Sequence, residues 1–196
     1  MCQRHFERVR RDLVRMAHAN YDLPRVFHET AQLVREAVPF DAACLHTLDR
    51  ASLLETSQSV LDLPLPHPRA TEIDYLEEDV NKFSDLARTS QVGIVDEATQ
   101  HQPERSARYR EPLAPLGLEG ELRVVFSSGG HAWGGAGLLR SRGAARFIQE
   151  AAAFLRSVSE IVAHAIRTTL VRATAVHLDE DPDADSGAGL PDAGRV

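Results

Sequence analysis

The sequence predicts an α+β protein in which an antiparallel sheet is followed by one long helix. Glu121–Ser128 and His131–Arg140 are runs of strand-forming residues on either side of Gly129-Gly130, a pair suited to a tight hairpin turn. Residues 145–175 then carry apolar side chains at spacings of three and four, the period of a helix. A hairpin that runs into a long helix is typical of small bacterial sensor modules.

The first half of the chain predicts two helices and two strands. Residues 4–19 have an amphipathic helical pattern, and Asp22 can cap a second helix that ends at Pro39. Residues 40–48 are predicted to form a mostly buried strand. Residues 53–60 are predicted to form a second strand, antiparallel to the first if the short turn between them makes a hairpin.

The middle of the chain predicts shorter elements. Residues 61–70 contain three prolines and are expected to form a loop. A helix is expected over 72–88, a short strand over Val92–Val95 and a further helix over Glu104–Leu116, with prolines breaking its end.

The long helix at 145–175 has two apolar stripes. One would pack on the sheet and the other on a partner helix in a homodimer; the alternative is one broad face buried within a monomer. The first stripe is Ile148, Ala151, Leu155, Val158, Val162 and Ala165, and the second is Phe147, Phe154 and Ile161. We expect an N-terminal helix over 1–20, a sensory domain over 21–176 and an acidic disordered tail or linker over 177–196.

Composition favours a cytoplasmic globular protein. The hydrophobic fraction is 43% and the charged fraction 26%, and no apolar run approaches the length of a membrane span or a signal sequence. We therefore expect no membrane association. Cys2 and Cys44 match neither a disulfide framework nor a zinc pattern.

The net charge of −7 is unevenly distributed. Residues 179–196 contain six acidic residues and one arginine, which leaves residues 1–178 near −2. A nearly neutral body gives no electrostatic signature of nucleic-acid binding. Five arginines in the first helix are interpreted as a solvated face, with a phosphate-binding face as the alternative.

Several motifs resemble catalytic signatures without matching them. Gly134-Gly135-Ala136-Gly137 leads into a strand rather than a helix, so it predicts close backbone approach instead of a nucleotide site. Ser127-Ser128-Gly129-Gly130-His131 lacks a nucleophile elbow and is interpreted as a hairpin turn. Histidine spacings give no metal-ligand pattern. We therefore expect no catalytic residues, no metal site and no enzyme activity, and the cofactor is unknown.

A few residues suit a small-molecule pocket. His46 alternates with Cys44 and Leu48 on a predicted strand, a position that can point inward. It is interpreted as a core or sheet-surface histidine with its hydrogen bonds satisfied, with a ligand contact or a haem or metal ligand as the alternatives. Trp133 and Tyr109 each combine an apolar body with a polar group, for either core packing or a pocket.

Three runs resemble a known family. They are Asp74–Arg88, Ser106–Gly117 and Trp133-Gly-Gly-Ala-Gly-Leu138. Together with the order of elements, they resemble the GAF-type sensor domains that form the N-terminal half of bacterial LuxR-type helix-turn-helix transcriptional regulators. The resemblance covers roughly residues 20–170.

This resemblance implies a six-stranded antiparallel sheet flanked by helices, with a small-molecule pocket on one face. Mapped onto that fold, the ligand-binding residues would be His46, Asp79, Phe83, Tyr109, Phe126 and Trp133. Asn81-Lys82-Phe83 departs in spacing from the signature of cyclic-nucleotide-binding members, and the cysteines of methionine-sulfoxide-reducing members are absent. No recognition helix follows residue 170, so direct DNA binding is not assigned to this chain.

The sequence therefore predicts a non-enzymatic, dimerising, GAF-like sensory domain that regulates transcription through a DNA-binding part absent from this chain. The alternative is a degenerate GAF module that serves only as a dimerisation or protein-interaction scaffold.

Overall fold

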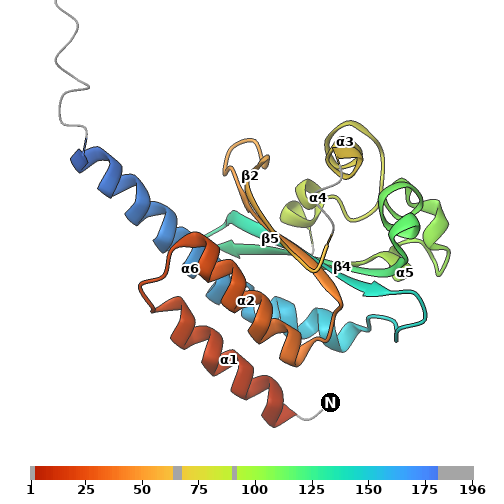
Figure 1. The fold of residues 1–196 in the computed structure, drawn as a ribbon, viewed down its shortest axis with the longest axis horizontal. Helices are drawn as coiled ribbons and strands as arrows, with labels where there is room; N and C mark the ends of the chain where they lie inside the picture. Colours follow the sequence, from red (N-terminus) through yellow and green to blue (C-terminus); the bar gives the residue numbers. More distant parts are fainter. Residues whose placement is uncertain (1–2, 64–67, 90–91, 181–196) are drawn as a thin grey trace, which may run out of the picture.

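A five-stranded antiparallel sheet separates two layers of helices (Figure 1). The computed structural model describes residues 3–63, 68–89 and 92–180, with side chains described up to residue 175. The strand order is β2-β1-β5-β4-β3. The strands are β1 (Ala42–Leu48), β2 (Glu55–Leu61), β3 (Val92–Ile94), β4 (Leu118–Ser128) and β5 (His131–Ser141). This architecture confirms the predicted α+β class.

Three long helices lie on one side of the sheet: two pack on its face, and the first in the chain packs on those two (Figure 1). They are α1 (Gln3–Ala17), α2 (Leu23–Ala37) and α6 (Gln149–Glu180). The main core lies between them and the sheet, and it includes Leu45 of β1, Val124 of β4 and Leu155 of α6. Burial of this continuous apolar face is the dominant stabilising contribution to the fold.

The second apolar stripe of α6 is covered by the chain's own first helix. Phe154 stacks on Phe6 of α1 with ring centroids 4.6 Å apart, and both Phe147 and Phe154 are buried. Phe147 and Phe154 are therefore covered within this chain, whereas Ile161 is half-buried.

The helix ends and turns follow local sequence signals. Asp22 accepts a hydrogen bond from the Arg25 backbone N–H at the start of α2, as predicted for an N-cap. Gly129 and Gly130 join β4 to β5 with positive φ angles of 59° and 78°, the conformation that a tight hairpin turn requires.

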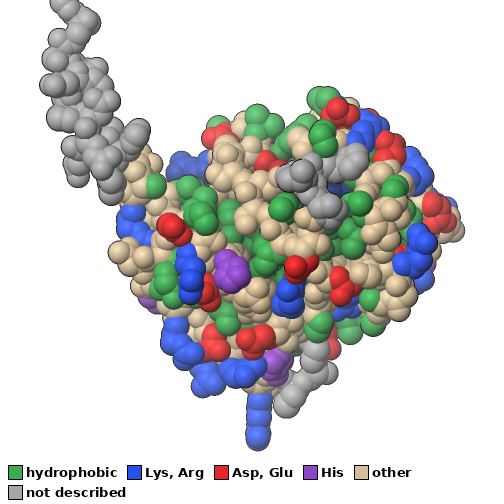
Figure 2. Space-filling model, viewed as in Figure 1, with side chains coloured by type: hydrophobic (Ala, Val, Ile, Leu, Met, Phe, Trp, Pro, Cys, Tyr) green, Lys and Arg blue, Asp and Glu red, His purple; other side chains and the backbone are tan. Residues whose placement is uncertain are grey.

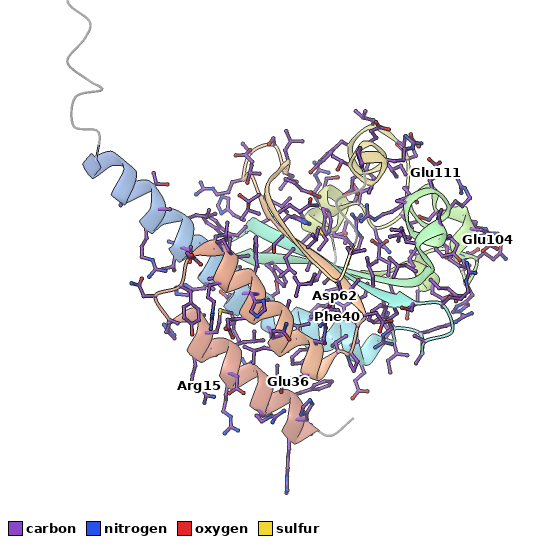
Figure 3. The ribbon with its side chains drawn as sticks, viewed as in Figure 1. Arg15, Glu36, Phe40, Asp62, Glu104 and Glu111 are labelled. Carbon is purple, nitrogen blue, oxygen red and sulfur yellow. The ribbon has the colours of Figure 1, made fainter. Side chains whose placement is uncertain are left out.

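Near the C-terminal end of α2, Arg35 donates to Asp62 at 2.6 Å; Figure 3 shows Asp62 beside Phe40 there.

The exposed face of α1 is basic. Figure 2 shows blue side chains along the lower edge of the molecule, where Figure 1 places α1. Arg8 pairs with Glu36 and Arg15 pairs with Asp12, and Figure 3 shows Arg15 projecting outward from α1. These exposed pairs suit a solvated helix face.

The predicted helix over 72–88 is wrong in its middle. The chain instead forms α3 (Pro68–Leu76) and α4 (Phe83–Arg88), separated by a turn. Asn81 has a positive φ of 56°, which an α-helix cannot accommodate, and the Asp79 carboxylate accepts from the adjacent Val80 N–H. Local side-chain hydrogen bonding therefore interrupts the helical pattern.

The region 104–116 also differs from the predicted helix. It forms a π-type turn at Tyr109–Leu113 between two short 3₁₀ turns, Pro103–Arg105 and Ala114–Leu116. Pro112 lies inside this segment and cannot donate a helical hydrogen bond. A further short helix, α5 (Val95–Ala98), occupies the end of the predicted strand Val92–Val95. Five strands, rather than six, form the sheet within the described residues.

Two sequence predictions concern the chain's ends. α6 begins at Gln149 and continues to Glu180, beyond the predicted limit of 175. The predicted tail beyond residue 180 lies outside the described residues. Across the described ranges, none of the helices combines the length and apolarity needed to span a bilayer.

Candidate functional site

A pocket lies on the sheet face opposite the three long helices. Water-sized molecules have about 60 Å³ of space within it. Polar side chains line one part and aliphatic side chains the other. The lining residues are Cys44, His46, Glu55, Gln58, Val60, Leu63, Ala70, Thr71, Asp74, Phe83, Arg108, Pro112, Leu113, Leu116, Glu121, Gly137 and Leu139.

His46 is the central polar residue of this pocket. Its side chain is 1% exposed, and neither ring nitrogen has a hydrogen-bond partner in the described part of the chain. The ring meets Phe83 edge to face, with centroids 4.2 Å apart. Burial, reinforced by the nearby charge of Arg123, lowers the His46 pKa to about 3. His46 is therefore a neutral imidazole at physiological pH.

Two arginines lie beside His46 in an ion-pair network. Arg123 is 1% exposed and donates to both Asp74 carboxylate oxygens, at 2.8 and 2.7 Å. It also donates to the Asn81 carbonyl oxygen at 2.9 Å. Arg108 donates to Glu121 at 2.7 Å. The bidentate pairing of Arg123 with Asp74 fixes α3, which carries Asp74, to strand β4.

The network perturbs its own carboxylates. Burial alone would raise the pKa of Asp74, but the charge and hydrogen bonds of Arg123 hold it below its usual range. Glu55 is different: burial, and then the nearby charge of Asp74, raise its pKa. Glu55 lies at the pocket with its Oε1 3.9 Å from His46 Nδ1, too far for a hydrogen bond.

Cys44 is an unreactive member of the pocket wall. Burial, and then the charge of Glu55, raise the pKa of its thiol to about 11, so the thiolate is suppressed. Its sulfur accepts a hydrogen bond from Gln58 Nε2 at 3.0 Å.

Close packing requires glycine on β5 beside these residues. A Cβ at Gly135 would lie 2.7 Å from His46 Nε2 and 2.9 Å from the Phe83 ring. A Cβ at Gly134 would lie 2.5 Å from the His46 carbonyl oxygen. The glycine run thus permits close approach, as the sequence interpretation proposed.

The structure brings two of the six predicted ligand-binding residues together in this pocket, His46 and Phe83. Asp79 lies nearby but holds the wall in place: its carboxylate accepts from the Ser106 hydroxyl at 3.0 Å and the Arg108 N–H at 2.8 Å. Tyr109 lines a separate groove between residues 103–109 and residues 143–147, which lie just before α6.

The other two predicted residues lie with the opposite core. Phe126 is 1% exposed and packs in the cluster beneath the long helices. Trp133 packs partly against the same cluster, and its indole N–H donates to the Ser128 carbonyl at 3.3 Å. Strand alternation explains the placement of Phe126, because Glu121, Arg123 and Val125 occupy the positions that face the pocket side.

Sequence reasoning missed the charged residues of the pocket: Glu55, Asp74, Arg108 and Glu121 line it, and Arg123 pairs with them from behind the wall. The available signal was the alternation of β4, where Glu121 and Arg123 occur two residues apart and alternate with the apolar Leu122 and Val124. Charged side chains on one face of a central strand indicate a paired ionic cluster. Within the described residues, no group of three or more His, Cys, Asp or Glu side chains could hold a metal ion.

Solved structures share this arrangement of sheet and helices. The GAF domain of a phosphoenolpyruvate-protein phosphotransferase from Coxiella burnetii is 15% identical, with a TM-score of 0.61 over 87% of this chain and 98% of that one. The GAF domain of a two-component sensor histidine kinase from Bacillus halodurans is 15% identical, with a TM-score of 0.53 over 78% and 98%.

A GAF domain/HD domain protein from Geobacter sulfurreducens is 16% identical, with a TM-score of 0.51 over 86% of this chain and 99% of that one. The chain has the GAF fold. One of these structures comes from a two-component sensor histidine kinase. Neither a protein-family model nor a curated protein matches the sequence.

Proposed function

We propose that this chain is a non-enzymatic sensory domain that binds a small molecule in the pocket around His46. The observation that carries the proposal is the His46 ring, which is buried at the pocket with both nitrogens unpartnered in the described structure. An unpaired buried polar group costs about 1–3 kcal/mol. A ligand that forms hydrogen bonds with this ring would recover part of that cost.

Two connections would carry a signal from the pocket to α6. The Ser159 hydroxyl of α6 donates to the Val125 carbonyl at 2.9 Å and accepts from the Ser127 N–H at 3.1 Å. At the sheet edge, Asp96 of α5 pairs with Arg146, just before α6, at 2.9 Å. A ligand would shift α6 only by binding two arrangements of these contacts unequally.

The proposal extends to dimerisation and transcriptional regulation. The resemblance to the N-terminal half of LuxR-type regulators supports the regulatory context. Ile148, directly before α6, and Val171 within it are 57% and 58% exposed. These side chains support self-association through the terminal helices, since it would remove them from water. DNA binding would belong to a part outside this chain.

A second candidate function is a scaffold that dimerises without sensing a ligand. The small free volume of the pocket favours it, because about 60 Å³ holds a few water molecules in the present arrangement. Arg108 and Arg123 are also each already paired with a carboxylate.

Native mass spectrometry separates the two candidates. We expect the purified chain to retain a discrete extra mass and to form a dimer. Gly137→Val should abolish the adduct, because Gly137 lines the pocket and a Cβ there would have its nearest neighbour at 3.7 Å, leaving room for an obstructing side chain. Ser57→Val, at an exposed strand position, is the matched control. A clean dimer after incubation with host extract would favour the scaffold, and a clean monomer would refute dimerisation.

A further inference from the structure

The charges on the pocket wall specify the class of ligand, if the proposed sensory function holds. The wall contains three carboxylates, from Glu55, Asp74 and Glu121, and one guanidinium, from Arg108. Arg123 lies directly against them and supplies a second positive charge. With these side chains ionised, the site has one negative charge in excess.

That excess charge belongs to Glu55. Arg108 is paired with Glu121 at 2.7 Å, and Arg123 is paired with Asp74 at 2.7 Å. Among the described residues, the Glu55 carboxylate accepts no hydrogen bond, and its Oε1 lies 3.9 Å from Nδ1 of the neutral His46. The Glu55 backbone N–H is fixed by the Tyr75 hydroxyl at 2.8 Å, which holds this residue at the pocket.

His46 adds a second acceptor at the same place. A neutral imidazole has one nitrogen that donates and one that accepts. The ring is almost completely buried and unpartnered within the described structure, so its acceptor nitrogen is available to a bound molecule. A carboxylate and an imidazole acceptor on the same wall are complementary to a ligand group that donates several hydrogen bonds and carries a positive charge.

The opposite part of the wall is aliphatic. Val60, Leu63, Leu113 and Leu139 line it, and the three leucines pack in one apolar cluster. We propose that the pocket binds a small organic ammonium ion, with its charged nitrogen between Glu55 and His46 and its aliphatic body against this cluster.

Other ligand classes fit less well. An anion would compete with Asp74 or Glu121 for an arginine that already has a carboxylate partner, and it would lie close to Glu55. A neutral alcohol would leave the Glu55 charge uncompensated in a partly buried site. A charge that is buried without a partner is costly, so both classes should bind more weakly than an ammonium ion.

Three probes of one size test this assignment: propylammonium, 1-propanol and propionate. Binding is measured from amide chemical shifts of the isotope-labelled chain at constant ionic strength, and the reporters are the pocket strands β1 and β2. We expect saturable binding of propylammonium with a dissociation constant of order millimolar, given so few heavy atoms. Glu55→Gln should weaken it about tenfold or more. Glu160→Gln, on the exposed surface of α6, should leave it unchanged.

The outcomes separate the ligand class from the sensory function. Tighter binding of propionate or 1-propanol at the same strands would overturn the ammonium assignment while leaving a functional pocket. Equal binding of propylammonium by wild type and Glu55→Gln would also overturn it. If none of the probes shifts the pocket signals, the ammonium assignment is wrong; a retained adduct in the mass spectrum would then still support sensing.

Discussion

Replacing His46 with leucine should stabilise the protein, although His46 is almost completely buried. Its two ring nitrogens lack partners in the described structure. Unsatisfied buried polar groups cost about 1–3 kcal/mol each, so removing two relieves at least about 2 kcal/mol. The edge-to-face contact with Phe83 is lost, at a cost of about 1 kcal/mol. The net expectation at pH 7.5 is a gain of about 1 kcal/mol.

The gain should grow in mild acid. The ordinary histidine pKa of 6.5 applies to the unfolded chain, whereas burial lowers the pKa of folded His46 to about 3. Between these values only the unfolded state binds the proton, so stability falls as pH falls from 6.5 towards 3. At pH 5.0 this linkage costs the wild type about 2 kcal/mol, and leucine cannot incur it. The His46→Leu gain should therefore reach about 3 kcal/mol.

Urea unfolding at pH 7.5 and 5.0 measures the gain in stability at each pH. The dependence of the free energy of unfolding on urea concentration shows whether unfolding exposes the same surface in both proteins. His28→Leu is the matched control because His28 is exposed on α2, and it should change stability by less than about 0.5 kcal/mol. Two results would refute the reasoning. One is destabilisation by His46→Leu, which would mean that the ring is hydrogen-bonded in solution. The other is a gain that does not depend on pH.

Three further changes test the site and the fold by urea unfolding. Arg123→Met should lower the free energy of unfolding by about 3–5 kcal/mol, because it leaves the Asp74 carboxylate buried without its bidentate partner. Adding Asp74→Leu should recover most of that loss. A double variant as unstable as the single one would argue against this pairing. Gly135→Ala should cost about 1–3 kcal/mol from its 2.7 Å approach to His46, whereas Gly137→Ala, with its nearest neighbour at 3.7 Å, should be nearly neutral. Equal effects of the two alanines would contradict the packing argument. Asp22→Ala should cost about 1 kcal/mol by removing the α2 N-cap, with Asp22→Asn retaining most of the stability.

The sequence predicted elements well where a local signal and the final packing agree. The hairpin around Gly129-Gly130 is an example, because the turn chemistry and the flanking strand patterns favour the same geometry. The helix over 72–88 failed because its apolar spacing continues through Asp79–Asn81, where side-chain hydrogen bonds and a positive φ break the helix. Hydrophobic periodicity does not reveal where side-chain hydrogen bonds to the backbone compete with the helix.

In the candidate site too, the predictions that rest on a local pattern succeeded and those that depend on tertiary packing failed. Alternation along one strand placed His46 inward, but Phe126 and Phe83 lie on opposite faces of the sheet. A set of ligand-binding residues carried over from a family resemblance does not distinguish these faces. The ion pairs join residues 49 positions apart in Asp74–Arg123 and 13 apart in Arg108–Glu121, so no local pattern specifies them.

The sequence by itself determined the first two helices, the hairpin, the α2 cap and the long final helix, because each depends on residues that are neighbours along the chain. Only the tertiary structure decided that α1 covers the second stripe of α6 and that Glu55 approaches His46 without pairing. It also decided that the arginines are paired with carboxylates. These features depend on side chains that come together when α3 and the strands pack around one pocket. The charged groups interact strongly only at those short distances.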